Sequence, residues 1–208
     1  MKTVKTILLI FAFSIPACIV NAQPDTLIKE RVKISGAYFS MGFDIVRSGM
    51  GGVIGGTMLL SNNWGVSFRF NPNAQRAKNF PDDYNDLFLG IPFLMNGIPS
   101  DNVSAVSFHV VKEYQTKTPL TRLGVEFGPA YIKYEEAVFT PVDGWIPLLG
   151  SNYDVTHDID KSIGFSVRGK LEFPVTRFAG IETSLYSVIN RLHPFFGVDF
   201  IVTLGLVR

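Results

Sequence analysis

The stretch PFFGVDFIVTLGLVR, residues 194–208, decides the fold. Large apolar side chains occupy every second position from Phe196 to Leu206, and small or polar residues such as Gly197 and Asp199 alternate with them. Because successive side chains of a β-strand point to opposite faces, this alternation predicts a strand with one apolar face. The segment is also long enough to cross a bilayer, since a tilted transmembrane strand needs roughly 9 to 11 residues.

Seven segments upstream of this stretch show the same alternation or a weaker form of it. They are Val32 to Ile45, Gly52 to Leu60, Trp64 to Phe70, Val103 to Tyr114, Leu120 to Gly128, Ile163 to Phe173 and Phe178 to Asn190. The second of these segments is the weakest, because glycine weakens a strand and leaves its parity ambiguous. The fifth is expected to stop near Pro129, which lacks an N–H and so belongs at a rim or in a bulge.

The connections between these segments fall into two classes that alternate along the chain. One side carries only three tight turns, whereas the other carries residues 47–51, 71–102, 135–161 and 191–193. Short turns on one side and longer loops on the other are typical of bacterial outer-membrane barrels, and a hydrocarbon layer demands a closed sheet. The sequence therefore predicts an all-β fold: an eight-stranded antiparallel up-and-down transmembrane β-barrel with two long external loops.

The N-terminal segment has the layout of a signal peptide. Lys2 and Lys5 precede an apolar run that is too short to span a membrane, and Ala22 supplies a small residue for cleavage. This predicts a signal peptide at residues 1–22 and an outer-membrane β-barrel domain at residues 23–208. Cys18 is the only cysteine, so cleavage after Ala22 leaves no disulfide chemistry. A weak lipoprotein-like context leaves the lipidation of Cys18 open.

The charged residues point to a closed interior. The chain holds 19 Lys and Arg against 18 Asp and Glu, which gives no electrostatic case for binding nucleic acid. On the polar faces of the strands, charges of both signs lie among glycine, serine and alanine. Eight strands leave room only for side chains, so these charges are expected to pair inside the lumen and not to line a pore. The predicted lumen network comprises Arg69, Arg122, Glu126, Arg168, Lys170, Glu172, Glu182 and Asp199.

Alternation alone also allows a soluble, exported lipocalin-like barrel that turns its apolar face inward and binds an apolar ligand. The outer surface of such a barrel should be dense in Lys, Glu, Asn and Gln, whereas the polar faces here are mostly small residues. We therefore expect the apolar rows to face lipid. Coordinates with charged side chains outside and an apolar cavity inside would invert this interpretation.

The first long loop contains an unexpectedly apolar segment, Leu87 to Ile98. If it is exposed, it makes a patch large enough for an external ligand or protein partner. If it folds over the barrel mouth, the same side chains plug the barrel, which is the interpretation we favour. The residues expected to make the external contact are Leu87, Phe88, Ile91, Phe93, Leu94 and Met95.

Motifs for metal or nucleotide chemistry are weak. The acidic stretch from Asp154 to Asp160 lacks the regular spacing of a calcium loop. The glycine-rich stretch from Gly49 to Gly56 lacks the Gly-Lys-Ser/Thr of a phosphate-binding loop. We therefore expect no metal and no cofactor.

Taken together, the N-terminal segment, the hairpin Ile163 to Asn190 and the row Phe196 to Leu206 resemble the small outer-membrane β-barrel family, the OmpA/OmpX-type, porin-like proteins of Gram-negative bacteria. The Gly205-Leu206 ending resembles the Bacteroidetes branch, whereas Arg208 departs from the aromatic residue that usually ends the assembly signal. The resemblance implies a cell-envelope protein in the outer membrane, in contact with outer-membrane lipid and the barrel-assembly machinery. It implies a structural or adhesion and ligand-contact role through the external loops.

Some barrels of this size modify lipid A with a serine, a histidine and an acid. Ser107 and His109 lie on one face of the fourth segment, and His193 lies beside the last strand. The sequence places no acid to orient either imidazole, as such a triad requires. The prediction is therefore no enzyme, with a lipid A-modifying barrel kept as an alternative.

Overall fold

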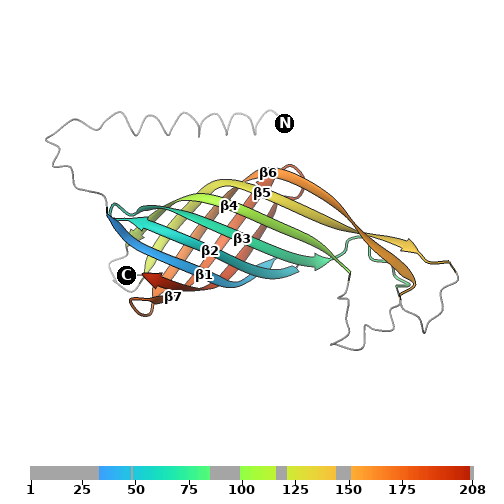
Figure 1. The fold of residues 1–208 in the computed structure, drawn as a ribbon, viewed down its shortest axis with the longest axis horizontal. Helices are drawn as coiled ribbons and strands as arrows, with labels where there is room; N and C mark the ends of the chain where they lie inside the picture. The colour runs from blue at the N-terminus through green and yellow to red at the C-terminus, as the bar shows by residue number, and fades with distance from the viewer. Residues whose placement is uncertain (1–32, 48, 85–98, 116–120, 144–150, 207–208) are drawn as a thin grey trace. The chain divides into compact units, whose positions relative to one another are not determined.

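The computed structural model describes residues 33–47, 49–84, 99–115, 121–143 and 151–206 of the chain. These residues are organised as eight strands (Figure 1). The strands are β1 (Ile34–Val46), β2 (Gly49–Leu60), β3 (Trp64–Arg76), β4 (Ser100–Gln115), β5 (Arg122–Pro141), β6 (Tyr153–Pro174), β7 (Ala179–Asn190) and β8 (Phe195–Leu206). None of the described residues belongs to a helix long and apolar enough to cross a membrane. The predicted signal peptide, Cys18, Arg208 and the apolar segment Leu87 to Ile98 lie outside the described residues.

Each strand pairs in antiparallel fashion with its sequence neighbours, and β8 pairs with β1 to close the barrel (Figure 1). The closing seam runs from the pair Ala37 and Leu206 to the pair Val46 and Gly197. The prediction of an eight-stranded up-and-down antiparallel barrel is confirmed. Gly197 to Leu206, within the stretch that led to that prediction, supply half of the closing seam.

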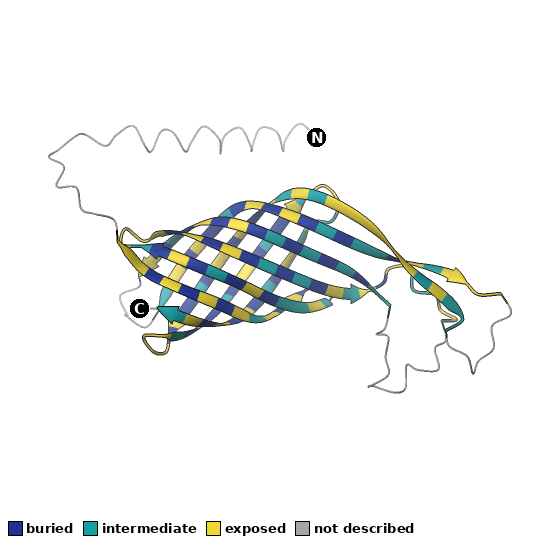
Figure 2. Ribbon diagram, viewed as in Figure 1, coloured by how far each residue is buried: buried dark blue, intermediate teal, exposed yellow. Residues whose placement is uncertain are grey.

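Burial alternates along the strands where they form the barrel wall, which gives the wall a chequered pattern of buried and exposed residues (Figure 2). The first part of β6 is the exception, because residues 156–161 are all exposed. Phe39 and Phe43 point outward and are exposed, whereas Ser40 and Asp44, the residues that follow them, point inward and are fully buried. Apolar side chains thus face outward and polar ones fill the interior. This is the opposite of a lipocalin-like barrel, so the soluble alternative does not fit the structure.

The paired part of the β5–β6 hairpin is longer than the sequence indicated. Residues 135–161 were expected to form a loop, but the register continues from Glu135 opposite Ile159 to Pro141 opposite Tyr153. Val138, Phe139 and Val155 supply the β-branched and aromatic side chains that favour strands, and the acids between them hid the alternation. The hairpin extends past the neighbouring strands (Figure 1).

Two other predicted loops are also shorter than expected. β3 continues to Arg76 and β4 starts at Ser100, so the connection expected at residues 71–102 is 77–99. β2 starts at Gly49, so the turn expected at residues 47–51 is only 47–48. The strand boundaries were predicted from the alternation of apolar and polar residues. Outside the lipid-facing zone, paired residues do not alternate as cleanly.

Two prolines lie within strands, which corrects the expectation of a rim or bulge position for Pro129. Pro129 is paired with Phe165 of β6, and the β4–β5 ladder is interrupted beside it, between Ala130 and Phe127. Pro72 of β3 sits at a similar interruption of the β2–β3 ladder. Proline lacks an N–H, so each of these prolines occupies a position where the ladder needs no donor on that side.

Candidate functional site

The centre of the lumen is a buried ion-pair cluster around Arg69. Its Nη2 lies 3.2 Å from Oε1 of Glu126 and 3.0 Å from Oε1 of Glu182, and its Nη1 donates a hydrogen bond of 2.7 Å to the Ser40 hydroxyl. The side chains of Arg69 and both glutamates are completely buried. Arg69 thereby neutralises two carboxylates from two other strands, in a space without solvent contact.

Two further cations continue the network on either side of Arg69. Arg168 pairs with Asp199 and donates a hydrogen bond of 2.6 Å to the Ser184 hydroxyl. Nζ of Lys170 lies 3.4 Å from Oε1 of Glu126 and 2.9 Å from Oε1 of Glu113. The Lys170 ammonium therefore bridges carboxylates on β4 and β5.

All eight charged residues named for the lumen network occupy inward-facing positions, and ion pairs join them into one cluster. Arg122 is the least buried member and reaches the others through Glu113, at 3.7 Å. Glu113 and Asp44 were not among the residues predicted for the lumen network, although the parity of their strands places both inside. Asp101 could not be found from the pattern because it was expected to lie in a loop.

Asp44 is a buried carboxylate held by neutral donors. Its Oδ2 accepts hydrogen bonds from Nδ2 of Asn71 at 3.1 Å, from Nδ2 of Asn73 at 2.9 Å and from the Tyr186 hydroxyl at 2.5 Å. These donors come from β3 and β7, so the carboxylate ties β1 to both sides of the barrel. Hydrogen bonds to a charged group are stronger than neutral ones, which makes this a structural anchor.

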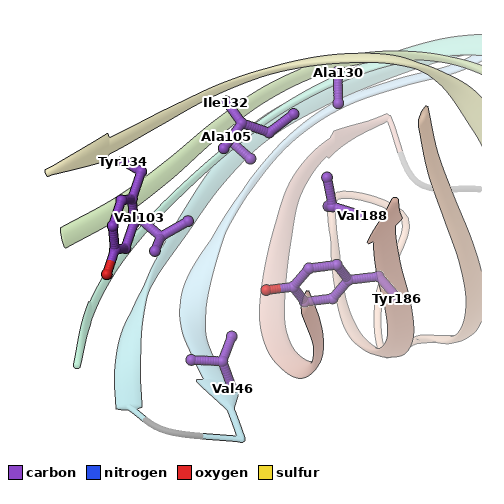
Figure 3. Close-up of a cluster of buried hydrophobic side chains, with 8 residues drawn as sticks. All are labelled: Val46, Val103, Ala105, Ala130, Ile132, Tyr134, Tyr186 and Val188. Atoms are coloured by element: carbon purple, nitrogen blue, oxygen red, sulfur yellow. The ribbon is translucent and has the colours of Figure 1, made fainter. Parts of the chain in front are cut away.

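An apolar cluster fills the lumen beyond this anchor, toward the end that carries the long connections (Figure 3). Phe195 of β8 packs against it. The side chains in the cluster come from four strands and are Val46, Val103, Ala105, Ala130, Ile132, Tyr134, Tyr186 and Val188. Charge pairs at mid-barrel and apolar packing above them leave a filled interior.

A pocket of about 240 Å³ opens at the barrel mouth above this cluster. It is lined by Val46, Arg47, Asn73, Gln75, Lys78, Val103, His193, Pro194, Phe195 and Phe196. The backbone N–H of Lys78 donates a hydrogen bond of 3.2 Å to Oδ2 of Asp101, and the Tyr134 hydroxyl donates one of 3.0 Å to the same oxygen. Asp101 thus fixes the chain after β3 against β5.

The histidine of this pocket is expected to titrate abnormally. Burial and the nearby Lys78 ammonium lower the pKa of His193 below its ordinary value of 6.5, against the weaker pull of Glu136 and Asp101. Nζ of Lys78 lies 3.4 Å from Nδ1 of His193, so the ammonium donates to the neutral ring. Because the folded-state pKa is depressed, neutral His193 favours the folded state above pH 6.5, and this contribution is lost as the pH falls through the folded pKa.

An NMR titration of the refolded chain in micelles should give His193 a pKa below 6.5. In Lys78→Gln, the loss of the neighbouring charge should raise the His193 pKa while burial still holds it under the ordinary value. A pKa at or above the ordinary value in the unaltered chain, or no change in Lys78→Gln, would contradict this assignment.

The serine and histidine considered for enzymatic chemistry do not meet. No hydrogen bond joins Ser107 to His109 among the described residues; Nδ1 of His109 instead lies 3.3 Å from the Ser67 hydroxyl and 3.7 Å from Oε2 of Glu126. Ser67, His109 and Glu126 do not form a triad, because the serine and the carboxylate both lie at Nδ1 and Nε2 of His109 has no partner among the described residues. All three are buried inside the filled lumen, where they serve packing and hydrogen bonding.

The acidic stretch weighed for a metal lies along the exposed part of β6. Asp154, His157, Asp158 and Asp160 are all exposed there. The described part of the chain contains no group of three or more His, Cys, Asp or Glu side chains arranged to hold a metal ion.

No protein-family model matches the chain, and no curated protein matches it significantly. Among solved structures, a major outer membrane protein from Thermus thermophilus is similar with a TM-score of 0.57 at 9% identity, over 82% of this chain and 98% of that one. Neisserial surface protein A is similar with a TM-score of 0.51 at 9% identity, over 81% of this chain and 95% of that one. The chain therefore has the barrel fold found in small outer-membrane proteins.

Proposed function

We propose that this chain is a non-enzymatic outer-membrane β-barrel protein without an open pore, which makes contacts through its external end. The observation that carries the proposal is the division between the two faces of the wall: exposed apolar side chains outside, paired charges inside. Turning a dense apolar surface toward water would be costly, whereas the same surface toward lipid is favourable.

The outer surface has the further features of a membrane-spanning barrel. Phe43 and Phe200 are both exposed and stack across the closing seam with ring centroids 5.2 Å apart. At the end with the short turns, Nζ of Lys112 lies 4.9 Å from the centre of the Trp64 ring, next to the exposed Tyr114. Aromatic and basic side chains of this kind belong at the boundary between lipid and water.

The protein is expected in the outer-membrane fraction, and its mature form should begin at Gln23 by N-terminal sequencing. Unboiled samples should migrate differently from boiled ones on electrophoresis gels, because a closed barrel resists detergent until heated. Planar bilayers containing the purified chain should show no steady ion current, since buried side chains fill its lumen. Recovery as a water-soluble periplasmic protein would contradict the proposed membrane location. Stable open-channel currents would contradict the proposed closed lumen.

The external contact surface that we propose is the free edge of β6. Pairing with β7 begins only at Gly164, so among the strands that the structure describes the preceding residues from Tyr153 pair with β5 alone. An unpaired edge presents backbone N–H and C=O groups that an extended segment of another protein can join. Asp154, Asp158 and Asp160 line this edge, which favours a partner segment that carries basic residues.

Shortening the hairpin tests this surface. Joining Glu135 to its cross-strand partner Ile159 through Asn-Gly removes the extension while keeping the register of the barrel. Cells that display this variant should lose adherence to protein-coated surfaces, while its heat-dependent gel mobility stays that of a folded barrel. The charge variant Asp154→Asn with Asp158→Asn should lose part of the same adherence. Unchanged adherence in the folded, shortened variant would rule out this edge as the contact surface.

The same proposal covers export and origin. Cleavage after Ala22, insertion by the barrel-assembly machinery and a Bacteroidetes source remain predictions from the sequence. They are supported by the signal-peptide layout and the Gly205-Leu206 ending. The lipid A-modifying alternative has no supporting contact among the described residues, where Ser107 and His109 lie inside the lumen.

A further inference from the structure

The mouth pocket combines cationic groups with apolar walls. Arg47 and Lys78 line it, and neither of these side chains forms an ion pair with any residue that the structure describes. The Lys78 ammonium lies over the Tyr134 ring, 5.3 Å from its centre, and contacts His193. Two cations beside one pocket, without a carboxylate paired to either, favour a negatively charged ligand.

The walls of the pocket restrict the kind of anion. Val46, Val103 and Phe195 belong to or pack against the apolar cluster that closes the lumen, so the floor of the pocket is apolar and fixed. An inorganic anion would leave these walls facing water, and a neutral apolar molecule would leave the cations without a partner. The lining therefore suits a compact molecule with one apolar face and one anionic group.

Asn73 forms a fixed part of the lining. It is only 5% exposed, and its Nδ2 donates a hydrogen bond of 2.9 Å to Oδ2 of Asp44.

We propose that the mouth pocket is a binding site for a small organic acid, with the carboxylate held by Lys78 and Arg47 and a compact apolar body against the apolar floor. A volume of 240 Å³ equals roughly eight water molecules at about 30 Å³ each, which sets the size of the ligand near that of a substituted benzoate. The inference is independent of the proposed adhesion role, because it rests on the mouth pocket and not on the β6 edge.

The test uses the full chain refolded in micelles and 4-hydroxybenzoate as the probe. A titration followed by backbone amide NMR should saturate, with the largest shifts at Val46, Val103 and Phe195. The neutral isostere 4-hydroxybenzamide should bind at least tenfold more weakly, because it lacks the charge that Lys78 and Arg47 recognise. Lys78→Gln and Arg47→Gln should each weaken 4-hydroxybenzoate binding about tenfold.

Arg177→Gln is the matched control, since it removes one exposed positive charge at the opposite end of the barrel and should leave the affinity unchanged. Gel mobility and the amide spectrum of each variant show that the barrel is folded. The proposal is overturned if the acid and the amide bind equally, if Lys78→Gln binds as the unaltered chain does, or if the shifts map away from the mouth. Absence of saturable binding up to millimolar probe also overturns it.

Discussion

Arg69→Met is expected to lower the free energy of unfolding of the barrel by about 3–5 kcal/mol, the usual cost of removing one partner from a buried ion pair. Arg69 is the only described residue that hydrogen-bonds or pairs with Glu182, and its Nη2 also neutralises part of Glu126. Methionine preserves much of the volume but leaves Glu182 as a fully buried carboxylate without an ion-pair partner. Burying a charge without a direct partner is costly.

Urea unfolding of the detergent-refolded chain, followed by tryptophan fluorescence and gel mobility, measures the effect. Arg177→Met removes an exposed arginine and should shift the free energy by no more than about 0.5 kcal/mol. Adding Glu182→Gln to Arg69→Met should recover part of the loss, because the amide needs no counter-ion. If the single variant is as stable as the parent, or if the second substitution worsens it, the lumen cluster does not carry the stability assigned to it.

Gly205→Ala is expected to weaken the closing seam by about 3 kcal/mol, from backbone strain together with overpacking. Gly205 is the one described glycine with a positive φ, at 137°, a region that side-chain-bearing residues rarely adopt. A Cβ at this position would lie 2.5 Å from the Ala37 carbonyl oxygen and 2.8 Å from Cα of Tyr38, both on β1. Backbone atoms of a paired strand cannot move aside without opening the β1–β8 ladder.

Gly169→Ala is the matched control. Gly169 faces outward on β6, and a Cβ added there meets no atom within 4 Å. This change should leave the unfolding free energy within about 0.5 kcal/mol of the parent. Both variants are compared by urea unfolding and by the yield of the heat-modifiable form during refolding. Equal stability of the two alanine variants would mean that the geometry at Gly205 does not limit closure of the barrel.

The strand pattern was predictable because the face that a side chain occupies follows from its place in a period of two. Arg69 and Glu182 could be assigned to the interior from their neighbours alone, since Phe68, Phe70, Ile181 and Thr183 occupy the opposite parity. The same rule placed Phe196 to Leu206 on the outer face without any knowledge of the partner strand. Alternation failed where no lipid enforces it, so the β5–β6 extension was taken for a loop.

Pro72 and Pro129 show a second limit of local reasoning. A proline in a strand is normally a reason to end the strand, yet both lie inside strands beside interrupted ladders. Whether the missing N–H of a proline costs a hydrogen bond depends on whether the adjacent strand places a backbone carbonyl opposite it. That information is absent from the residues around the proline.

The sequence by itself determined that there are eight strands, which face each alternating residue takes, and therefore that this chain closes into a barrel with apolar side chains outside. The tertiary structure alone decided the partners: Arg69 meets Glu182, 113 residues away, and Lys78 meets His193, 115 residues away. The physical reason is that alternation is a property of neighbouring residues, whereas pairing across a lumen depends on the register of every strand between. Because side chains repeat with a period of two, a slip of about two residues between neighbouring strands would leave each face unchanged and give each charge a different partner.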